Sequence, residues 1–231
     1  MTVGRPRLVR AASLLAAATV GSRVLGLVRE VVVAALFGAT DAKAAYVIGY
    51  YVPFFVQRLF LGGTLSVVLI PTLAEVEARA SAAERTRVVG ALATLVVGIG
   101  VAMVVLGQVG APWLVRIAAP GFAANPAQMA LTVHLTRINF LAMFFLALAV
   151  FATAYLQAQQ RFTAPALAPL AFNVTIIALT LWLGPRLGIT GLAVAWVAGT
   201  AVQFAAQAPA LLAAGFRPRL DVEWTHPALR T

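Results

Sequence analysis

Six long apolar stretches limit what this chain can fold into more than any other feature of its sequence. They cover residues 8–37, 45–74, 88–109, 129–157, 164–183 and 189–214. A helix of about 20 residues crosses the roughly 30 Å hydrocarbon core of a bilayer, and each stretch is long enough for one. Hydrophobic residues make up 62% of the sequence and charged residues 10%, a balance foreign to water-soluble domains. We therefore predict an all-α integral membrane protein whose residues 1–216 form six transmembrane helices.

The basic residues lie between the apolar stretches and predict the orientation of the chain. Ten arginines fall on one side of the predicted membrane: Arg5, Arg7, Arg10, Arg79, Arg85, Arg87, Arg161, Arg217, Arg219 and Arg230. Only Lys43, Arg116 and Arg186 fall on the other side. Because cytoplasmic segments of membrane proteins carry the excess of Lys and Arg, we predict that both chain ends are cytoplasmic. Arginines scattered in this way do not predict a nucleic-acid-binding face. Residues 217–231 are predicted to form a cytoplasmic connector to a second lobe.

Ionisable residues inside the predicted spans are candidates for function. Arg23, Arg29 and Glu30 lie in the first span and Arg58 in the second, with Arg137 as a weaker candidate in the fourth. Such a residue costs about 2.5–3.5 kcal/mol at mid-bilayer and has to face protein or a water-filled cavity. Three arginines against one carboxylate favour an anionic ligand such as a pyrophosphate, which arginine forks bind well. Alternatively, Glu30 neutralises an arginine of the second span and only locks helices together.

Glycine and amide residues complete the set of candidates. Gly26 lies between the first-span arginines, and Gly62 with Gly63 follows Arg58, so we predict that they are hinges or close packing points. Asn173 is expected to form hydrogen bonds between helices.

The sequence excludes the common classes of enzyme site. It contains no cysteine, no HExxH motif, no Ser/His/Asp set and no paired carboxylates, and Gly62-Gly63 lacks the flanks of a phosphate loop. We therefore predict neither an enzyme nor a bound cofactor or metal.

The first span contains the motif Ser22-Arg23-Val24-Leu25-Gly26-Leu27-Val28-Arg29-Glu30, with Phe37-Gly38 after it. This motif resembles the first-span signature of the MurJ/MviN family of lipid II flippases, which belongs to the MOP exporter superfamily. The similarity continues through Arg58-Leu59-Phe60, Ala111-Pro112-Trp113, Ala119-Pro120-Gly121-Phe122, Leu135-Thr136-Arg137-Ile138, Arg161-Phe162, Asn173 and Gly215-Phe216-Arg217-Pro218-Arg219. It covers nearly the whole chain but less than half of the family's usual length.

The resemblance implies a fold, a function and a location. The fold would be the N-terminal six-helix lobe of a MOP exporter, which rocks against a second lobe in the bacterial inner membrane. The function would be to flip a polyprenyl-pyrophosphate-linked peptidoglycan precursor. Arg23 and Arg29 match cavity arginines of the family, and Arg58 matches the second member of an Arg-Arg pair whose first member is Gln57 here. Asp41 is a possible substitute for a family carboxylate.

Some positions depart from the family pattern and leave other functions open. Lys43-Ala44 replaces Thr-Asp, Phe54 replaces Asn, and Gly62 replaces Glu. One alternative is a membrane scaffold that does not transport, and another is an exporter of a different polyprenyl-linked glycan. A transporter would need a second lobe, supplied by a missing C-terminal half, a separate half-chain or a homodimer.

Overall fold

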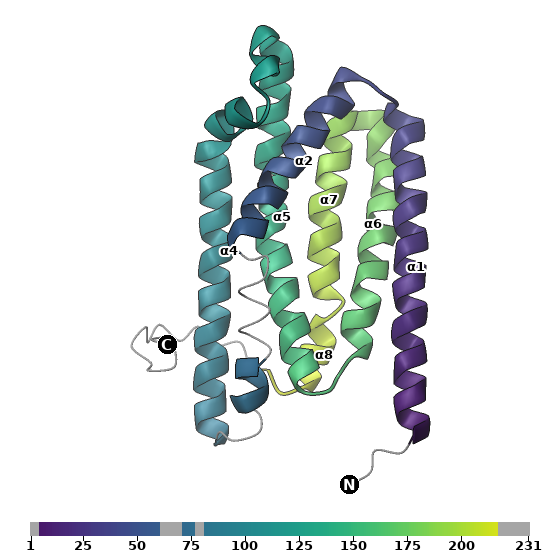
Figure 1. The fold of residues 1–231 in the computed structure, drawn as a ribbon, viewed down its shortest axis with the longest axis vertical. Coiled ribbons are helices and arrows are strands. Elements are labelled where there is room, and N and C mark those ends of the chain that lie inside the picture. The colour runs from purple at the N-terminus through teal and green to yellow at the C-terminus, as the bar shows by residue number, and fades with distance from the viewer. Residues whose placement is uncertain (1–4, 61–70, 77–80, 217–231) are drawn as a thin grey trace.

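The computed structural model describes residues 5–60, 71–76 and 81–216, and in this part of the chain it contains helices and no strand (Figure 1). The helices are α1 (Arg5–Phe37), α2 (Asp41–Phe60), α4 (Ala82–Ala118), α5 (Pro126–Ala158), α6 (Thr163–Leu187), α7 (Ile189–Ala205) and α8 (Ala208–Ala213), with a short 3₁₀ helix η1 (Pro120–Ala124). The predicted all-α fold is confirmed for these residues. Gly62, Gly63 and the predicted connector 217–231 lie outside them.

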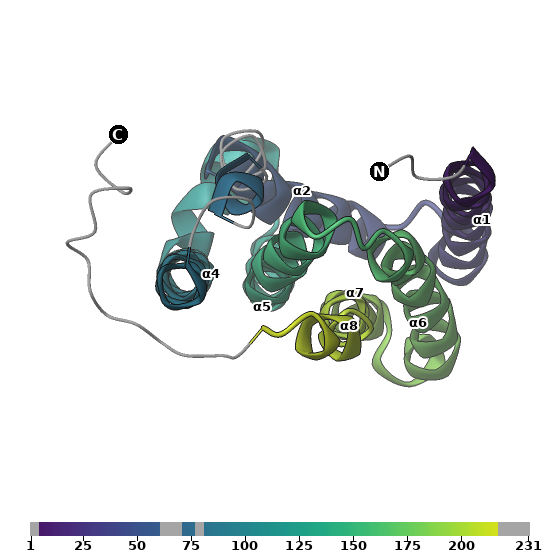
Figure 2. The same ribbon diagram turned by 90° about the horizontal axis from the view of Figure 1, so that it is seen from below.

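The helices form a bundle around α5, which packs against α2, α4, α6, α7 and α8. In both views α1 and α4 lie at opposite ends of the bundle, and α1 packs mainly on α6 (Figures 1 and 2). Helix α2 leaves the end of α1 and crosses diagonally toward α4 (Figure 1). The first two helices therefore rest on different neighbours, α1 on α6 and α2 on α5.

Four helical segments of the described chain are long and apolar enough to cross a membrane. They are Ala83–Ala118, Pro126–Ala158, Thr163–Leu187 and Ile189–Ala213. They correspond to the last four predicted spans. Helix α1 has 33 residues, but Arg23, Arg29 and Glu30 interrupt its apolar surface. The predicted second span includes residues outside the described part, so the first two spans stay predictions.

The third predicted span ends too early, because α4 does not stop at residue 109 but continues through Pro112 to Ala118. Proline has no N–H to donate to the carbonyl four residues earlier, which belongs to Gln108. The Nε of Arg137 in α5 donates to this carbonyl over 3.1 Å, and Gln108 Nε2 donates to the Arg137 carbonyl over 3.0 Å. Arg137 thus satisfies the carbonyl that the proline leaves free, and the helix continues.

Small residues let α5 approach its neighbours closely. A Cβ added to Gly107 of α4 would overlap the ring of Phe140, whose side chain is fully buried. A Cβ added to Gly49 of α2 would lie 3.0 Å from Leu135 Cβ. Close approach of this kind replaces the hydrophobic effect as a source of helix association in lipid.

The contact between Gly107 and Phe140 predicts the effect of adding one methyl group. We expect Gly107→Ala to destabilise the protein by about 1–3 kcal/mol, because the Phe140 ring has to shift within a packed core. Gly98→Ala in the same helix is the matched control, since nothing lies within 4 Å of its added Cβ. Thermal unfolding in detergent is the measurement, and equal midpoints for the two variants would contradict the close packing of α4 on α5.

Candidate functional site

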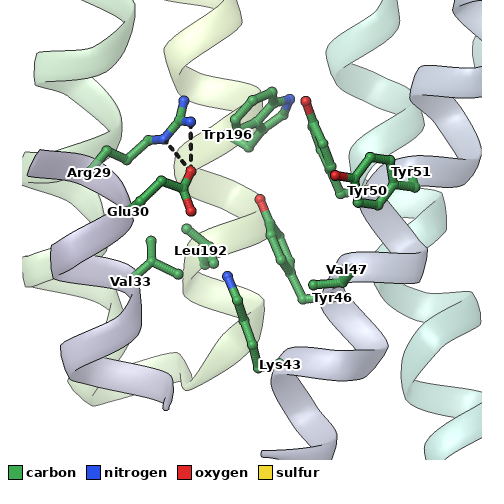
Figure 3. A pocket seen from close by; sticks show the side chains of 10 residues that line it. All are labelled: Arg29, Glu30, Val33, Lys43, Tyr46, Val47, Tyr50, Tyr51, Leu192 and Trp196. Atoms are coloured by element: carbon green, nitrogen blue, oxygen red, sulfur yellow. Dashed lines mark hydrogen bonds and ion pairs between the residues drawn. The ribbon is translucent and has the colours of Figure 1, made fainter. Parts of the chain in front are cut away.

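A polar pocket of about 140 Å³ opens between α1, α2 and α7 (Figure 3). Its lining residues are Arg29, Glu30 and Val33 from α1, Lys43, Tyr46, Val47, Tyr50 and Tyr51 from α2, and Leu192 and Trp196 from α7. The pocket holds two basic groups and one carboxylate, so its formal charge is +1 when all three are ionised. It is the candidate functional site.

Arg29 and Glu30 form an ion pair on the pocket side of α1. Arg29 Nη2 donates to Glu30 Oε1 over 2.7 Å, and Arg29 Nε donates to the same oxygen over 3.2 Å. The Arg29 side chain is 19% exposed and the Glu30 side chain 61%. Glu30 thus neutralises its own neighbour in α1, and not an arginine of the second span as one interpretation of the sequence held.

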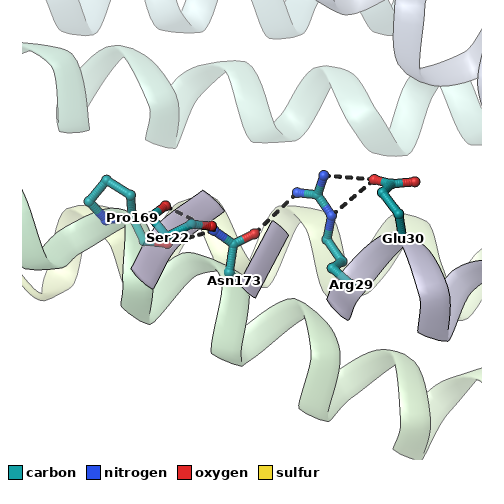
Figure 4. A network of polar contacts seen from close by, with 5 residues as sticks. All are labelled: Ser22, Arg29, Glu30, Pro169 and Asn173. Atoms are coloured by element: carbon teal, nitrogen blue, oxygen red, sulfur yellow. Dashed lines mark hydrogen bonds and ion pairs between the residues drawn. The ribbon is translucent and has the colours of Figure 1, made fainter. Parts of the chain in front are cut away.

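A second set of contacts ties Arg29 to α6 (Figure 4). Arg29 Nη1 donates to Asn173 Oδ1 over 3.3 Å. The Asn173 amide in turn donates to the Pro169 carbonyl over 2.9 Å and to the Ser22 hydroxyl over 3.3 Å. Asn173 is 5% exposed and joins α6 to α1 at two points, Ser22 and Arg29. It therefore forms the hydrogen bonds between helices that the sequence predicts.

The contacts of Arg29 leave part of its guanidinium available. The group has five N–H donors, and the three contacts above use one on each nitrogen. Its carbon lies 5.3 Å from the ring centroid of Trp196, in the geometry of a cation–π contact. One N–H on each terminal nitrogen remains for another acceptor, so a fixed arginine fork can still donate to an anion.

Lys43 supplies the second basic group, from the beginning of α2. Its Nζ lies 5.4 Å from the ring centroid of Tyr46, and Figure 3 shows the side chain extending toward Leu192 and Glu30. Burial lowers the pKa of Lys43 below its ordinary value of 10.5, while the Glu30 carboxylate raises this pKa and Arg29 lowers it. An anion in the pocket would stabilise the charged amine.

Aromatic rings form a second wall of the pocket, and one of them is the Trp196 ring that Arg29 contacts. The rings of Tyr46 and Tyr50 lie 6.3 Å apart and are nearly parallel, at 13°. Trp196 packs edge-on against Tyr50 at 4.6 Å and against Phe172 of α6 at 5.0 Å. These contacts fix the ring positions and connect α2 and α7 beneath the pocket.

Other residues predicted as site residues lie away from this pocket. Arg23 and Arg58 are exposed, and Arg58 lines a different, largely apolar pocket of about 630 Å³ between α2 and α4. Asp41 and Gln57 do not line the polar pocket, and Arg137 binds Gln108 as described above. Among the described residues, an added Cβ at Gly26 meets nothing within 4 Å, so none of them packs closely on this glycine.

Sequence reasoning gave no role to several residues that line the pocket. Lys43 was used only for the predicted orientation and as a departure from the family pattern, and Trp196 lies in the last apolar stretch. Tyr46 and Tyr50 are four residues apart, a spacing that places two side chains on one helix face. Two tyrosine hydroxyls at this spacing, close in sequence to Lys43, were the signal from which a polar pocket could have been predicted.

Comparison with known proteins supports the predicted family. The family described as lipid II flippase MurJ matches residues 33–231. The lipid II flippase MurJ of Burkholderia cenocepacia is 32% identical over 195 residues, which cover 84% of this chain and 38% of that protein. The probable lipid II flippase MurJ of Vibrio cholerae is 32% identical over 234 residues, covering 96% of this chain and 44% of that protein.

The fold matches as well. A solved structure of lipid II flippase MurJ in an inward closed conformation superposes with a TM-score of 0.70 and 25% sequence identity. The match covers 90% of this chain and 43% of that one, so the chain spans less than half the length of its relatives. The predicted MOP-type transporter fold is thereby confirmed. Because the family matches most of its residues, the chain belongs to the lipid II flippase MurJ family, a family of transporters, and corresponds to the N-terminal lobe.

Proposed function

We propose that this chain is the N-terminal lobe of a lipid II flippase and helps to move a polyprenyl-pyrophosphate-linked peptidoglycan precursor across the bacterial inner membrane. The pocket between α1, α2 and α7 carries this proposal, because it presents a preorganised arginine fork and a lysine inside a membrane protein of this family. The relatives named above are described as lipid II flippases. We also propose that both ends of the chain lie on the cytoplasmic side of this membrane.

The proposed role of the pocket is to bind the pyrophosphate. The two N–H groups that Arg29 has left and the amine of Lys43 provide donors from opposite sides of the pocket. Charge-assisted hydrogen bonds of this kind are shorter and stronger than neutral ones. Arg23 on α1 and Arg58 on α2 are exposed in this lobe, and we propose that they meet the substrate outside the pocket, where a second lobe would close the cavity.

A second lobe completes the proposed transporter. The chain spans 38% and 44% of the two relatives, so the remaining length of such a protein is available for a second helical lobe. Movement of the two lobes against each other would expose the pocket to each side of the membrane in turn. The protein binds and releases its substrate in this scheme and breaks no covalent bond.

Binding of a polyprenyl pyrophosphate by the purified protein, followed by native mass spectrometry, tests the proposed site. We expect Arg29→Ala to weaken binding at least tenfold, because a hydrogen bond to a charged group contributes about 1.5–3 kcal/mol. Arg23→Ala and Arg58→Ala are expected to have smaller effects, since neither residue lines the pocket.

Arg186→Ala is the matched control for this experiment. Arg186 lies 5.2 Å from the Trp182 ring, nearly the same cation–π geometry as Arg29 and Trp196, but it lies at the C-terminal end of α6 and does not line the pocket. We expect the Arg186→Ala variant to bind the polyprenyl pyrophosphate as tightly as the wild type does. If Arg29→Ala and Arg186→Ala bind equally well, the pocket is not the pyrophosphate site, and a scaffold without transport becomes the better interpretation.

Glu30 competes with the proposed ligand for Arg29, which gives a second prediction. Glu30→Gln raises the formal charge of the pocket from +1 to +2. It also weakens the hydrogen bonds that Arg29 Nε and Nη2 donate to the residue at position 30. We therefore expect the same polyprenyl pyrophosphate to bind several-fold more tightly. Asp41→Asn, which removes a carboxylate near Lys43 that does not line the pocket, is expected to change little. Weaker binding by Glu30→Gln would show that the carboxylate positions the fork instead of competing for it.

A further inference from the structure

The aromatic wall of the pocket has free polar groups as well as ring surface. In the described part of the chain, the hydroxyls of Tyr46 and Tyr50 have no hydrogen-bond partner. Tyr155 shows the contrast, because its hydroxyl contacts Arg85 at 3.3 Å and the Ala214 carbonyl at 3.5 Å. Tyr46 is only 6% exposed, and Figure 3 shows its hydroxyl pointing into the pocket beside Glu30 and below Trp196.

Neither hydroxyl oxygen is sealed from the pocket, so both can form hydrogen bonds with water or with a ligand there. The two hydroxyls lie one helical turn apart on nearly parallel rings, and the indole of Trp196 meets the second ring edge-on. Donors and acceptors are therefore arranged around an apolar surface. The packing of Tyr50 against Phe54 at 5.8 Å also restrains this arrangement.

A pyranose ring has the complementary chemistry. Its axial C–H groups form an apolar face that packs on the electron-rich face of an aromatic ring. Its hydroxyls lie around the ring perimeter, where they donate and accept hydrogen bonds as tyrosine hydroxyls do. A purely apolar chain would leave both tyrosine hydroxyls unsatisfied, and a second anion would meet no additional positive charge at this wall.

We infer that Tyr46, Tyr50 and Trp196 form a sugar subsite that binds the first pyranose ring of the lipid-linked substrate. The inference rests on the proposed function, because the sugar is attached directly to the pyrophosphate placed at Arg29 and Lys43. The basic groups and the aromatic wall line the same pocket, so a sugar attached to the phosphate lies within reach of the wall. The wall then distinguishes a glycan-bearing lipid from a bare polyprenyl pyrophosphate.

Two probe lipids test the subsite in lipid nanodiscs. One is a polyprenyl pyrophosphate that carries a single pyranose sugar, and the other is the same lipid without the sugar. We expect the wild type to bind the first more tightly. The double variant Tyr46→Phe with Tyr50→Phe keeps both rings and removes only the hydroxyls, and we expect it to bind the sugar-bearing lipid about tenfold more weakly and the bare lipid unchanged. Tyr155→Phe removes a hydroxyl that lies outside the pocket and is expected to retain the preference.

The outcomes separate this inference from the function on which it rests. If the double variant loses affinity for both lipids equally, or if the wild type does not prefer the sugar, the sugar subsite is wrong. In either case, a continued loss of binding in Arg29→Ala would still support the pyrophosphate site. If the wild type binds neither lipid, the proposed function itself fails, and the sugar subsite fails with it.

Discussion

The hydrogen-bonded charge cluster of Arg29, Glu30 and Asn173 is the interaction on which the arrangement of the site depends. A guanidinium in a membrane helix has to be paired and hydrogen-bonded, because leaving it unsatisfied costs several kcal/mol. Glu30 supplies the opposite charge within α1, and Asn173 supplies an acceptor from α6. The same contacts therefore satisfy the charge, attach α1 to α6 and leave two N–H groups of Arg29 unused.

The attachment of α1 to α6 leaves α2 free to follow a different path. Helix α2 packs on α5, where Gly49 allows close contact and Asn139 donates to the Gly49 carbonyl over 3.3 Å. Helix α7 lies between these two helix pairs and contributes Trp196. A pocket forms because the first two helices are held by different neighbours and lie far enough apart for polar side chains to face each other between them.

Much of the fold was predictable from the sequence, because apolar length alone places the helices. The third predicted span shows the limit of this reasoning. Pro112 indicates a helix end, and only the contact with Arg137, 25 residues later, explains why α4 continues. The site shows the same limit. The cost of burying charge identified Arg29 and Glu30, but which charges share a pocket depends on helix rotation, and that rotation brings in Lys43 and Trp196 instead of Arg23 and Arg58.

The ion pair also has a consequence for the proposed transport. A flippase has to release its substrate on the far side, so a site that binds pyrophosphate too tightly would retain it. With Glu30 in place, an incoming anion gains only the unused donors of Arg29 and the charge of Lys43. Because Glu30 keeps its hydrogen bonds to Arg29, the guanidinium remains neutralised when the anion leaves, and release costs less free energy. In this view a carboxylate beside the arginine moderates the affinity, and the aromatic wall restores selectivity through contacts that carry no net charge.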